Sequence, residues 1–198
     1  MYCEIILVQH ALTQWNVDRR CQGHTDTPLN GTGRKMAHLL AERLKDEEVA
    51  VIYTSDLRRA YETAGPFLSM KPLLIYKDER LREGRWKNQE QAGEYPVLPF
   101  YVDFEESHDV SDRAVAVLNE IAKKHPKQRV LVISHSGIIN RFIGYVRENT
   151  EQAFPEYKRI KTAINRFVYQ DGKWSCIRLN DDAHLVQLNR VDLSKDNG

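Results

Sequence analysis

The stretch CEIILVQH, at residues 3–10, sets the first element of the fold. Residues 3–8 form a short run rich in β-branched residues and leucine, which is typical of a strand buried on both faces of a parallel sheet. His10 comes just beyond the carboxyl end of this expected strand. A second run of the same kind, RVLVIS at residues 129–134, leads directly into His135. Two histidines therefore follow two expected buried strands.

The rest of the chain alternates between helical and strand patterns. Helical spacing of apolar residues predicts helices at residues 33–45, 57–68, 110–121 and 137–146. Asn30 is the expected N-cap of the first helix. Strand patterns occur at residues 49–54, 73–76, 163–169 and 174–179, and a Gln-Asp-Gly-Lys turn joins the last two as a hairpin. This order predicts an α/β fold, a three-layer α/β/α sandwich with a mostly parallel sheet.

The length of the chain predicts a single domain over residues 1–198, because chains usually divide only beyond roughly 250 residues. Periodicity is lost at residues 84–107, a segment that contains several aromatic residues and prolines. We expect this segment to form a short excursion, or lid, over the edge of the sheet. The polar tail at residues 191–198 is expected to be loose.

Composition argues against several classes of partner and location. The 29 basic and 28 acidic residues leave a net charge of +1, so no overall field attracts nucleic acid or an anionic membrane. The apolar run at residues 5–8 is too short for a signal sequence or a membrane span. The three cysteines are far apart, which indicates neither a disulfide framework nor a zinc site. We expect a cytoplasmic protein, and its oligomeric state stays undetermined.

Several chemically competent side chains follow the expected strands. Ligands of such sheets bind outside the carboxyl ends of the strands, which places together His10, Ser55, Glu83 and His135. A neutral imidazole can attack phosphorus, and cationic donors can stabilise the charge on the phosphoryl oxygens. A carboxyl group can protonate the leaving oxygen and then activate water, and Glu83 is the candidate for that role. The residues therefore predict a pocket for a phosphoryl group.

Six motifs in a fixed order carry a resemblance to a known family. They are VQHALTQWN at 8–16, CQGHTDTPLNGTG at 21–33, YTSDLRRAYETA at 53–64, DERLRE at 78–83, LVISHSG at 131–137 and NDDAHL at 180–185. Over almost its whole length the chain resembles the histidine phosphatase superfamily, the phosphoglycerate mutase-like family. The resemblance implies the fold of that family and hydrolysis of a small phosphorylated metabolite through a phosphohistidine, with no metal or other cofactor.

The resemblance also implies a role for individual residues. His10 matches the phosphoryl-accepting nucleophile, Glu83 the acid/base carboxylate, and Arg59 and His135 the other catalytic positions. The phosphate-binding positions fall on Gln9, Asn16, Gln22, Gly23, Arg59 and His135. His184 matches a terminal histidine whose role the resemblance does not define. The remaining histidines are interpreted as surface or structural residues, namely His24, His38, His108 and His125.

The chain departs from the family pattern around the expected pocket. Gln9 stands where the family has arginine, Ala11 where it has glycine, and Leu12 where it has glutamate. Glutamine can donate hydrogen bonds to a phosphoryl oxygen but brings no charge. We therefore expect a phosphatase whose activity is reduced or specialised. The alternative is an inactive family member that binds a phosphorylated ligand or partner.

Two further activities receive less support. A serine hydrolase would need the pattern G-x-S-x-G, whereas Ser136 has Ser134 and Ile138 at the flanking positions. A phosphoglycerate mutase would need to shield its phosphohistidine from water, and the excursion at residues 84–107 is short for that purpose. Hydrolysis is therefore favoured over mutase activity.

Overall fold

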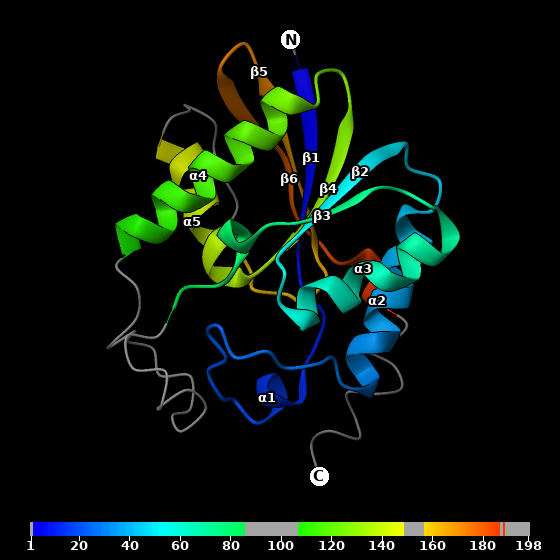
Figure 1. The fold of residues 1–198 in the computed structure, drawn as a ribbon. Coiled ribbons are helices and arrows are strands. Elements are labelled where there is room, and N and C mark those ends of the chain that lie inside the picture. The colour runs from blue at the N-terminus through cyan, green and yellow to red at the C-terminus, as the bar shows by residue number, and fades with distance from the viewer. Residues whose placement is uncertain (1, 86–106, 149–156, 187, 189–198) are drawn as a thin grey trace.

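The computed structural model describes residues 2–85, 107–148, 157–186 and 188, except for the side chains of residues 107 and 108. The strands are β1 (Tyr2–Gln9), β2 (Val49–Thr54), β3 (Ile75–Lys77), β4 (Arg129–Ser134), β5 (Ile164–Gln170) and β6 (Lys173–Asp181). Within the described residues they form one six-stranded sheet in the order β3-β2-β4-β1-β5-β6 (Figure 1). Strands β1 to β4 are parallel, while β5 is antiparallel to both β1 and β6. The predicted α/β class with a mostly parallel sheet is confirmed.

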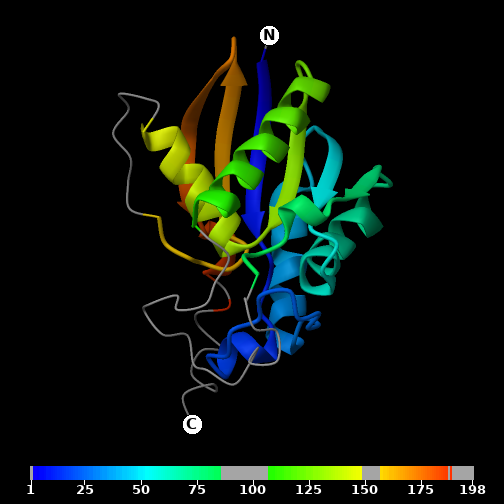
Figure 2. The same cartoon turned by 60° about the vertical axis from the view of Figure 1, so that its left-hand side comes forward.

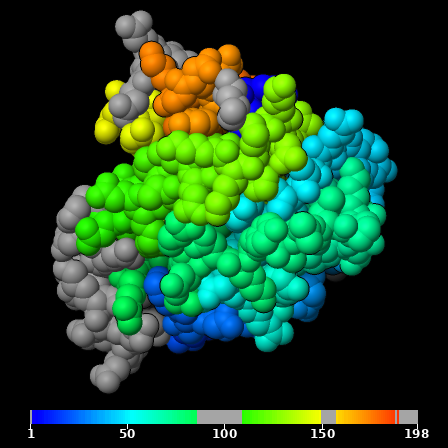
Figure 3. All heavy atoms as spheres, turned by 45° about the horizontal axis from the view of Figure 1, so that its top comes forward, coloured from blue at the N-terminus to red at the C-terminus, as the bar shows by residue number. Residues whose placement is uncertain are grey.

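Helices cover both faces of this sheet. They are α1 (Gln14–Val17), α2 (Gly31–Leu44), α3 (Arg58–Met70), α4 (Ser107–Lys124) and α5 (Ser136–Glu148), with short 3-10 helices η1 (Glu79–Leu81) and η3 (Ala183–Leu185). Helices α4 and α5 pack on one face, and α2 and α3 pack on the other (Figure 2). In the space-filling view, α4 lies in green between the orange strand β5 and the blue-green α3 (Figure 3). The predicted three layers are therefore present.

Strand β1 shows why its sequence lacks a polar alternation. Ile5 and Leu7 pack in the cluster formed with α4 and α5, whereas Ile6 and Val8 pack in the cluster formed with α2 and α3. All four side chains are 0% exposed. Burying each such side chain stabilises the fold by about 1.5–3 kcal/mol. Both faces of the strand therefore require apolar residues.

The start of α2 is built against the segment that follows β1. Asn30 is the N-cap, as predicted, and its Oδ1 accepts a hydrogen bond from the Gly33 backbone N–H at 2.7 Å. The helix begins at Gly31, two residues before its predicted start, because the cap precedes the first turn. A Cβ at Gly33 would lie 1.9 Å from the carbonyl oxygen of Leu12. Glycine at this position therefore lets the helix approach the His10 segment closely.

The other predicted elements are present, with small shifts in their bounds. The hairpin of β5 and β6 turns at Asp171 and Gly172, with φ angles of 50° and 84°, which suit a two-residue hairpin turn. Strand β3 begins at Ile75 rather than residue 73, because its parallel pairing with β2 begins there. The short elements α1, η1 and η3 were not predicted, since a few residues carry too little periodicity.

Some predictions lie outside the described residues. These are most of the expected lid, residues 86–106, and the whole tail at residues 191–198. The expectation of a single domain stays a prediction. None of the helices in the described part of the chain has the length and apolar character needed to cross a membrane.

Candidate active site

The two histidines lie side by side at the carboxyl ends of β1 and β4. Gln9 is opposite Ser134 in the parallel register, so the residue after each strand is a histidine at the same level. The ring centroids of His10 and His135 are 5.1 Å apart, with planes inclined at 57°. The His10 backbone N–H also donates to the Ser134 carbonyl oxygen at 2.9 Å. The sheet therefore brings the predicted pair together, as its parallel topology requires.

Contacts of His10 define which ring nitrogen carries a proton. Nδ1 lies 2.7 Å from the carbonyl oxygen of Ala11, which only accepts hydrogen bonds, so Nδ1 carries the proton and Nε2 has a free electron pair. Burial lowers the pKa of His10 well below its ordinary value, and the charges of Lys161 and Arg59 lower it further. A neutral imidazole with an unprotonated Nε2 is the form that can attack phosphorus.

His135 has the opposite arrangement. The Arg59 Nε–H donates to His135 Nδ1 at 3.3 Å, and because arginine never accepts, the proton of the neutral His135 is on Nε2. Burial is the largest cause that lowers the pKa of His135 well below its ordinary value, and electrostatic interactions with Arg59 and His10 lower it further. Its Nε2 is buried and has no hydrogen-bond partner among the described residues. His135 therefore presents an unused N–H donor.

Arg59 joins this pair to the loop after α1. Its terminal nitrogens donate to the carbonyl oxygens of Gly23 and Thr25, each at 2.7 Å. Only 1% of the residue is exposed, and burial lowers the pKa of Arg59 to about 10, so it stays charged at neutral pH. Each terminal nitrogen has a second N–H that these two bonds do not use. Arg59 thus holds the loop while keeping donors for an anion.

The other predicted phosphate ligands lie in α1 and in the loop that follows it, but the side-chain oxygens of Asn16 and Gln22 also have structural partners. Gln22 Oε1 accepts hydrogen bonds from the hydroxyls of Thr13, at 3.0 Å, and Thr27. Asn16 Oδ1 accepts from the Thr13 backbone N–H at 3.2 Å and closes the capping box of α1. Gly23 has a φ of 48°, which suits glycine at this turn. Phosphate binding by Asn16, Gln22 and Gly23 stays a prediction.

Glu83 is fixed at the amino end of α5. Its Oε1 accepts from the Gly137 backbone N–H at 2.9 Å, and its Oε2 accepts from the Ser136 hydroxyl at 3.0 Å. A Cβ at Gly137 would lie 2.0 Å from Oε1, so only glycine leaves room for the carboxylate. The positive end of the helix dipole also favours a carboxylate here. Because α5 begins directly after His135, this contact places Glu83 beside the histidine pair.

Lys161 is a further residue of the candidate site, and none of the sequence motifs indicates it. Its Nζ lies 3.4 Å from Nε2 of His10, although 151 residues separate the two in the chain. Burial first, and then the charge of Arg59, lower the pKa of Lys161 to about 7, although the charge of Glu83 acts in the opposite direction. The one available signal was its place just before the strand predicted at residues 163–169. Only the antiparallel pairing of β5 with β1, with Ile164 opposite Val8, brings that place to the pocket.

Two other residues near Glu83 were not assigned to the site. The ring of His24, interpreted from the sequence as surface or structural, contacts the Glu83 carbonyl oxygen through Nε2 at 2.8 Å. Tyr157 has a buried hydroxyl with no hydrogen-bond partner in the part of the chain that is described. Burial raises the pKa of Tyr157, and the charge of Glu83 raises it further. His24 therefore contacts the backbone of Glu83, and Tyr157 lies close enough to Glu83 for its charge to act on the hydroxyl.

Gln9 occupies the position where the family pattern has arginine. It is 2% exposed, and its side-chain oxygen has no hydrogen-bond partner among the described residues. Its own carbonyl oxygen accepts from the Thr162 backbone N–H at 3.0 Å, which ties Gln9 to the segment of Lys161. The pocket therefore has a neutral side chain at position 9 and an additional cation close by.

Fold and site together define an α/β protein with two neutral histidines, an arginine and a carboxylate gathered at the carboxyl ends of parallel strands. The chain belongs to the histidine phosphatase superfamily (branch 1), whose family model matches residues 5–182. The predicted family is thereby confirmed.

Individual relatives and solved structures agree with this membership. The chain is 33% identical over 204 residues to the metal-independent phosphoserine phosphatase of Arabidopsis thaliana, covering 93% of this chain and 84% of the relative. It is 31% identical over 207 residues to phosphoglycerate mutase-like protein 4 of the same plant, covering 94% and 88%. The structure of YhfR from Bacillus stearothermophilus superposes with a TM-score of 0.79 at 26% identity, covering 92% of this chain and 99% of YhfR.

Proposed function

We propose that the protein hydrolyses the phosphomonoester of a small metabolite through a phosphohistidine on His10, without a metal ion. The observation that carries the proposal is the opposite protonation of the two facing imidazoles. His10 offers an electron pair at Nε2, and His135 offers an N–H donor at Nε2. A phosphoryl group between them would meet a nucleophile and a donor for one of its oxygens.

The first half reaction transfers the phosphoryl group to the protein. His10 Nε2 attacks phosphorus, the new N–P bond forms, and the bond from phosphorus to the leaving oxygen breaks. Glu83, which enters this half reaction in its protonated form, gives its proton to that oxygen and becomes a carboxylate, so the alcohol leaves neutral. The His10 ring becomes cationic, and its Nδ1–H remains bonded to the Ala11 carbonyl oxygen, which favours this charge. Arg59 and His135 donate to the phosphoryl oxygens throughout.

The second half reaction restores the free protein. The Glu83 carboxylate takes a proton from a water molecule while the oxygen of that water attacks phosphorus. The N–P bond breaks, its electron pair returns to His10 Nε2, and inorganic phosphate leaves. The name of the Arabidopsis phosphoserine phosphatase supports hydrolysis and a metal-independent reaction for this chain too. Gln9 provides no charge, so the activity is expected to be reduced or specialised relative to a pocket with two arginines.

Rapid-quench labelling tests the proposal. The parent protein should form an acid-labile phosphoprotein from a ³²P-labelled phosphomonoester and release inorganic phosphate, whereas His10→Ala should do neither. His38→Ala, a change at an exposed position of α2, serves as the matched control and should behave like the parent. A panel containing phosphoserine, 3-phosphoglycerate, sugar phosphates and nitrophenyl phosphate would identify the preferred class of substrate.

The same experiment separates hydrolysis from binding alone. An inactive member that holds a phosphorylated ligand would bind phosphate or vanadate in calorimetry without phosphoprotein or turnover. Labelling that persists in His10→Ala would remove His10 as the nucleophile.

A further inference from the structure

The pocket lacks an arginine at position 9 but contains a cation that the family pattern does not define. We infer that Lys161 is a catalytic residue of this protein, whose ammonium group binds the phosphoryl oxygens in place of the arginine absent from position 9. This inference rests on the proposed function and names the group that specialises the site.

The position of the ammonium group is the first argument. Lys161 Nζ is 3.4 Å from His10 Nε2, the nitrogen that has the free electron pair. A phosphorus atom under attack lies about 3–3.5 Å from its nucleophile. A cation that reaches the same electron pair in the free protein is therefore beside the phosphoryl oxygens once a phosphate enters. The contact also keeps the attacking nitrogen free of a proton until that moment.

The backbone holds Lys161 in this position through an unusual conformation. Thr162, the next residue, has a φ of 60°, in the left-handed region that β-branched residues rarely adopt. Three contacts maintain it: its N–H donates to the Gln9 carbonyl oxygen at 3.0 Å, its hydroxyl donates to the Lys161 carbonyl oxygen at 2.7 Å, and His184 Nε2 contacts that hydroxyl at 3.1 Å. Because the hydroxyl proton is used, His184 is the donor in the last contact.

These contacts give a role to His184, which the resemblance left undefined. His184 orients Thr162, and Thr162 connects the backbone of Lys161 to that of Gln9. The segment that positions the lysine is therefore attached to the residue whose charge it replaces. His184 is a positioning residue in this arrangement, since none of its contacts is to the reacting groups.

The electrostatic surroundings favour an anion beside Lys161. Within the described residues Lys161 forms no ion pair with a carboxylate, and its ammonium group contacts the proposed nucleophile His10. Arg59 repels its charge, Glu83 attracts it, and Lys161 lies close enough to His10 and His135 for its charge to lower the pKa of each. A lysine held among like charges, with a pKa lowered to about 7, gains stabilisation when a phosphate dianion binds. A purely structural lysine would instead be paired or directed to solvent.

Substitution of Lys161 provides the first test. Lys161→Met keeps much of the shape but removes the charge, and it should reduce kcat about 10²–10³-fold, the effect of losing one oxyanion donor. Lys161→Arg should retain most of the activity, because the charge remains. Lys158→Met is the matched control, because Lys158 is exposed in the same segment and its hydrogen bonds in the described part of the chain, to Asn180 and Ile160, are made by backbone atoms. This substitution should leave kcat unchanged.

A second substitution distinguishes a catalytic cation from a structural lysine. Gln9→Arg in the Lys161→Met background should restore turnover at least about tenfold, because it returns a cation to the pocket by another route. The same change in the parent should give a smaller gain, since Lys161 already supplies the charge. His184→Ala should lower kcat less than Lys161→Met and leave KM for the substrate nearly unchanged. Equal effects of Gln9→Arg in both backgrounds would contradict the inference.

Calorimetry with inorganic phosphate separates failure of this inference from failure of the proposed function. Lys161→Met should bind phosphate at least about tenfold more weakly than the parent, while Lys158→Met should bind it equally well. Turnover in the parent with unchanged kcat and phosphate affinity in Lys161→Met overturns the inference and leaves the function standing. Phosphate binding that depends on Lys161, in a parent without turnover, overturns the function and supports the cation as a ligand of phosphate. Absence of both turnover and phosphate binding in the parent overturns both.

Discussion

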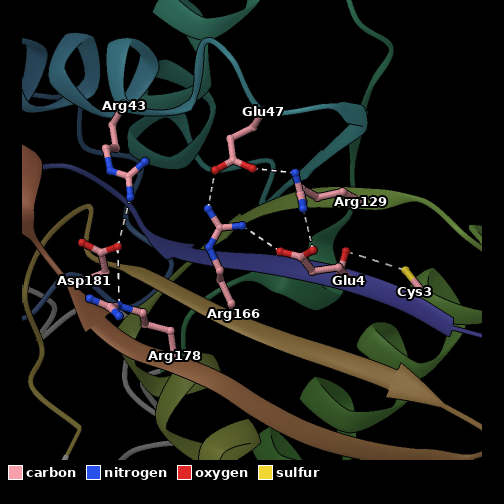
Figure 4. A network of polar contacts seen from close by, with 8 residues as sticks. All are labelled: Cys3, Glu4, Arg43, Glu47, Arg129, Arg166, Arg178 and Asp181. Carbon is pink, nitrogen blue, oxygen red and sulfur yellow. Dashed lines mark hydrogen bonds and ion pairs between the residues drawn. The ribbon is translucent and has the colours of Figure 1, made fainter.

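At the amino ends of β1 and β4 four charged side chains close a ring, whereas at the carboxyl ends of the same strands Arg59 and Lys161 pair with no carboxylate among the described residues. Glu4 and Glu47 each accept hydrogen bonds from both Arg129 and Arg166, with N–O distances of 2.5 to 2.9 Å (Figure 4). A second chain of contacts beside the ring joins Arg43 and Arg178 through Asp181. Each carboxylate oxygen of the ring contacts one arginine nitrogen.

The carboxyl ends contain the same kinds of residue in an unmatched arrangement. Arg59 and Lys161 lie near each other, Glu83 is bonded to the amino end of α5, and His135 has an unused donor. In the ring each charged group faces groups of the opposite charge, so a further anion would gain little there. A group of cations and unused donors costs stability, and an anion offsets that cost. The difference supports the carboxyl end as the place of the proposed reaction.

The largest effect on the proposed activity is expected from disrupting the contact between Glu83 and α5. Gly137→Ala places a methyl group where the carboxylate lies and should displace Glu83. Hydrolysis of an alkyl phosphate should fall about 10²-fold, the lower range for loss of a general acid, and hydrolysis of nitrophenyl phosphate should fall less. Steady-state kinetics on both substrates measure the difference.

Gly144→Ala is the control for that change, because it lies in the same helix with nothing within 4 Å of the added methyl group. It should leave both rates unchanged. Equal losses on the two substrates in Gly137→Ala would mean that Glu83 does not protonate the leaving group.

The pH dependence of kcat/KM sharpens the electrostatic part of the comparison. Lys161 acts as an ammonium group, so activity is present below its pKa of about 7 and is lost as the pH rises through that value. One deprotonation gives a decline of about tenfold per pH unit on the alkaline side. Lys161→Arg should move this decline to higher pH, because a guanidinium group stays charged.

The acidic side of the same profile reports on the nucleophile. Burial lowers the pKa of His10 well below its ordinary value, so His10 should remain neutral and competent when the pH falls through 6.5. A loss of activity at that pH, present in the parent and in Lys161→Arg alike, would contradict a neutral His10.

Substitutions in the ring of ion pairs should change the stability of the protein and leave its activity unchanged. Burial by itself raises the pKa of Glu4, but hydrogen bonds from Arg129 and Arg166 outweigh it and leave the pKa below its ordinary value. Glu4→Gln should lower the free energy of unfolding by about 1–2 kcal/mol at neutral pH. Because the folded pKa is the lower one, this contribution is present above the unfolded pKa and is lost as the pH falls through the folded pKa.

Denaturant unfolding of parent and Glu4→Gln across pH measures this effect. Glu42→Gln is the control, since Glu42 is exposed and its ion pair among the described residues is with the exposed Lys45, and such pairs contribute little. A kcat/KM that changes more than about twofold in Glu4→Gln would show that the two ends are coupled, against the comparison.

Much of the fold could be predicted because it depends on local patterns. The continuous apolar runs of β1 and β4 mark strands buried on both sides, and Asn30 marks the start of α2 through its side-chain cap. His10 and His135 follow those strands in the chain, so parallel pairing of the strands is enough to bring them together. Local patterns are not enough to predict the position of Glu83, because this position depends on a glycine in α5 that leaves room for the carboxylate.

The sequence by itself determined the layers, the parallel sheet and the histidine pair, since periodic burial and strand order are written into neighbouring residues. Only the tertiary structure decided that Lys161 faces His10 and that His184 supports it through Thr162. These contacts depend on the antiparallel register of β5 against β1 and on one left-handed residue. Neither leaves a periodic signal, because a register joins residues that are distant in the chain and a single backbone angle has no repeat.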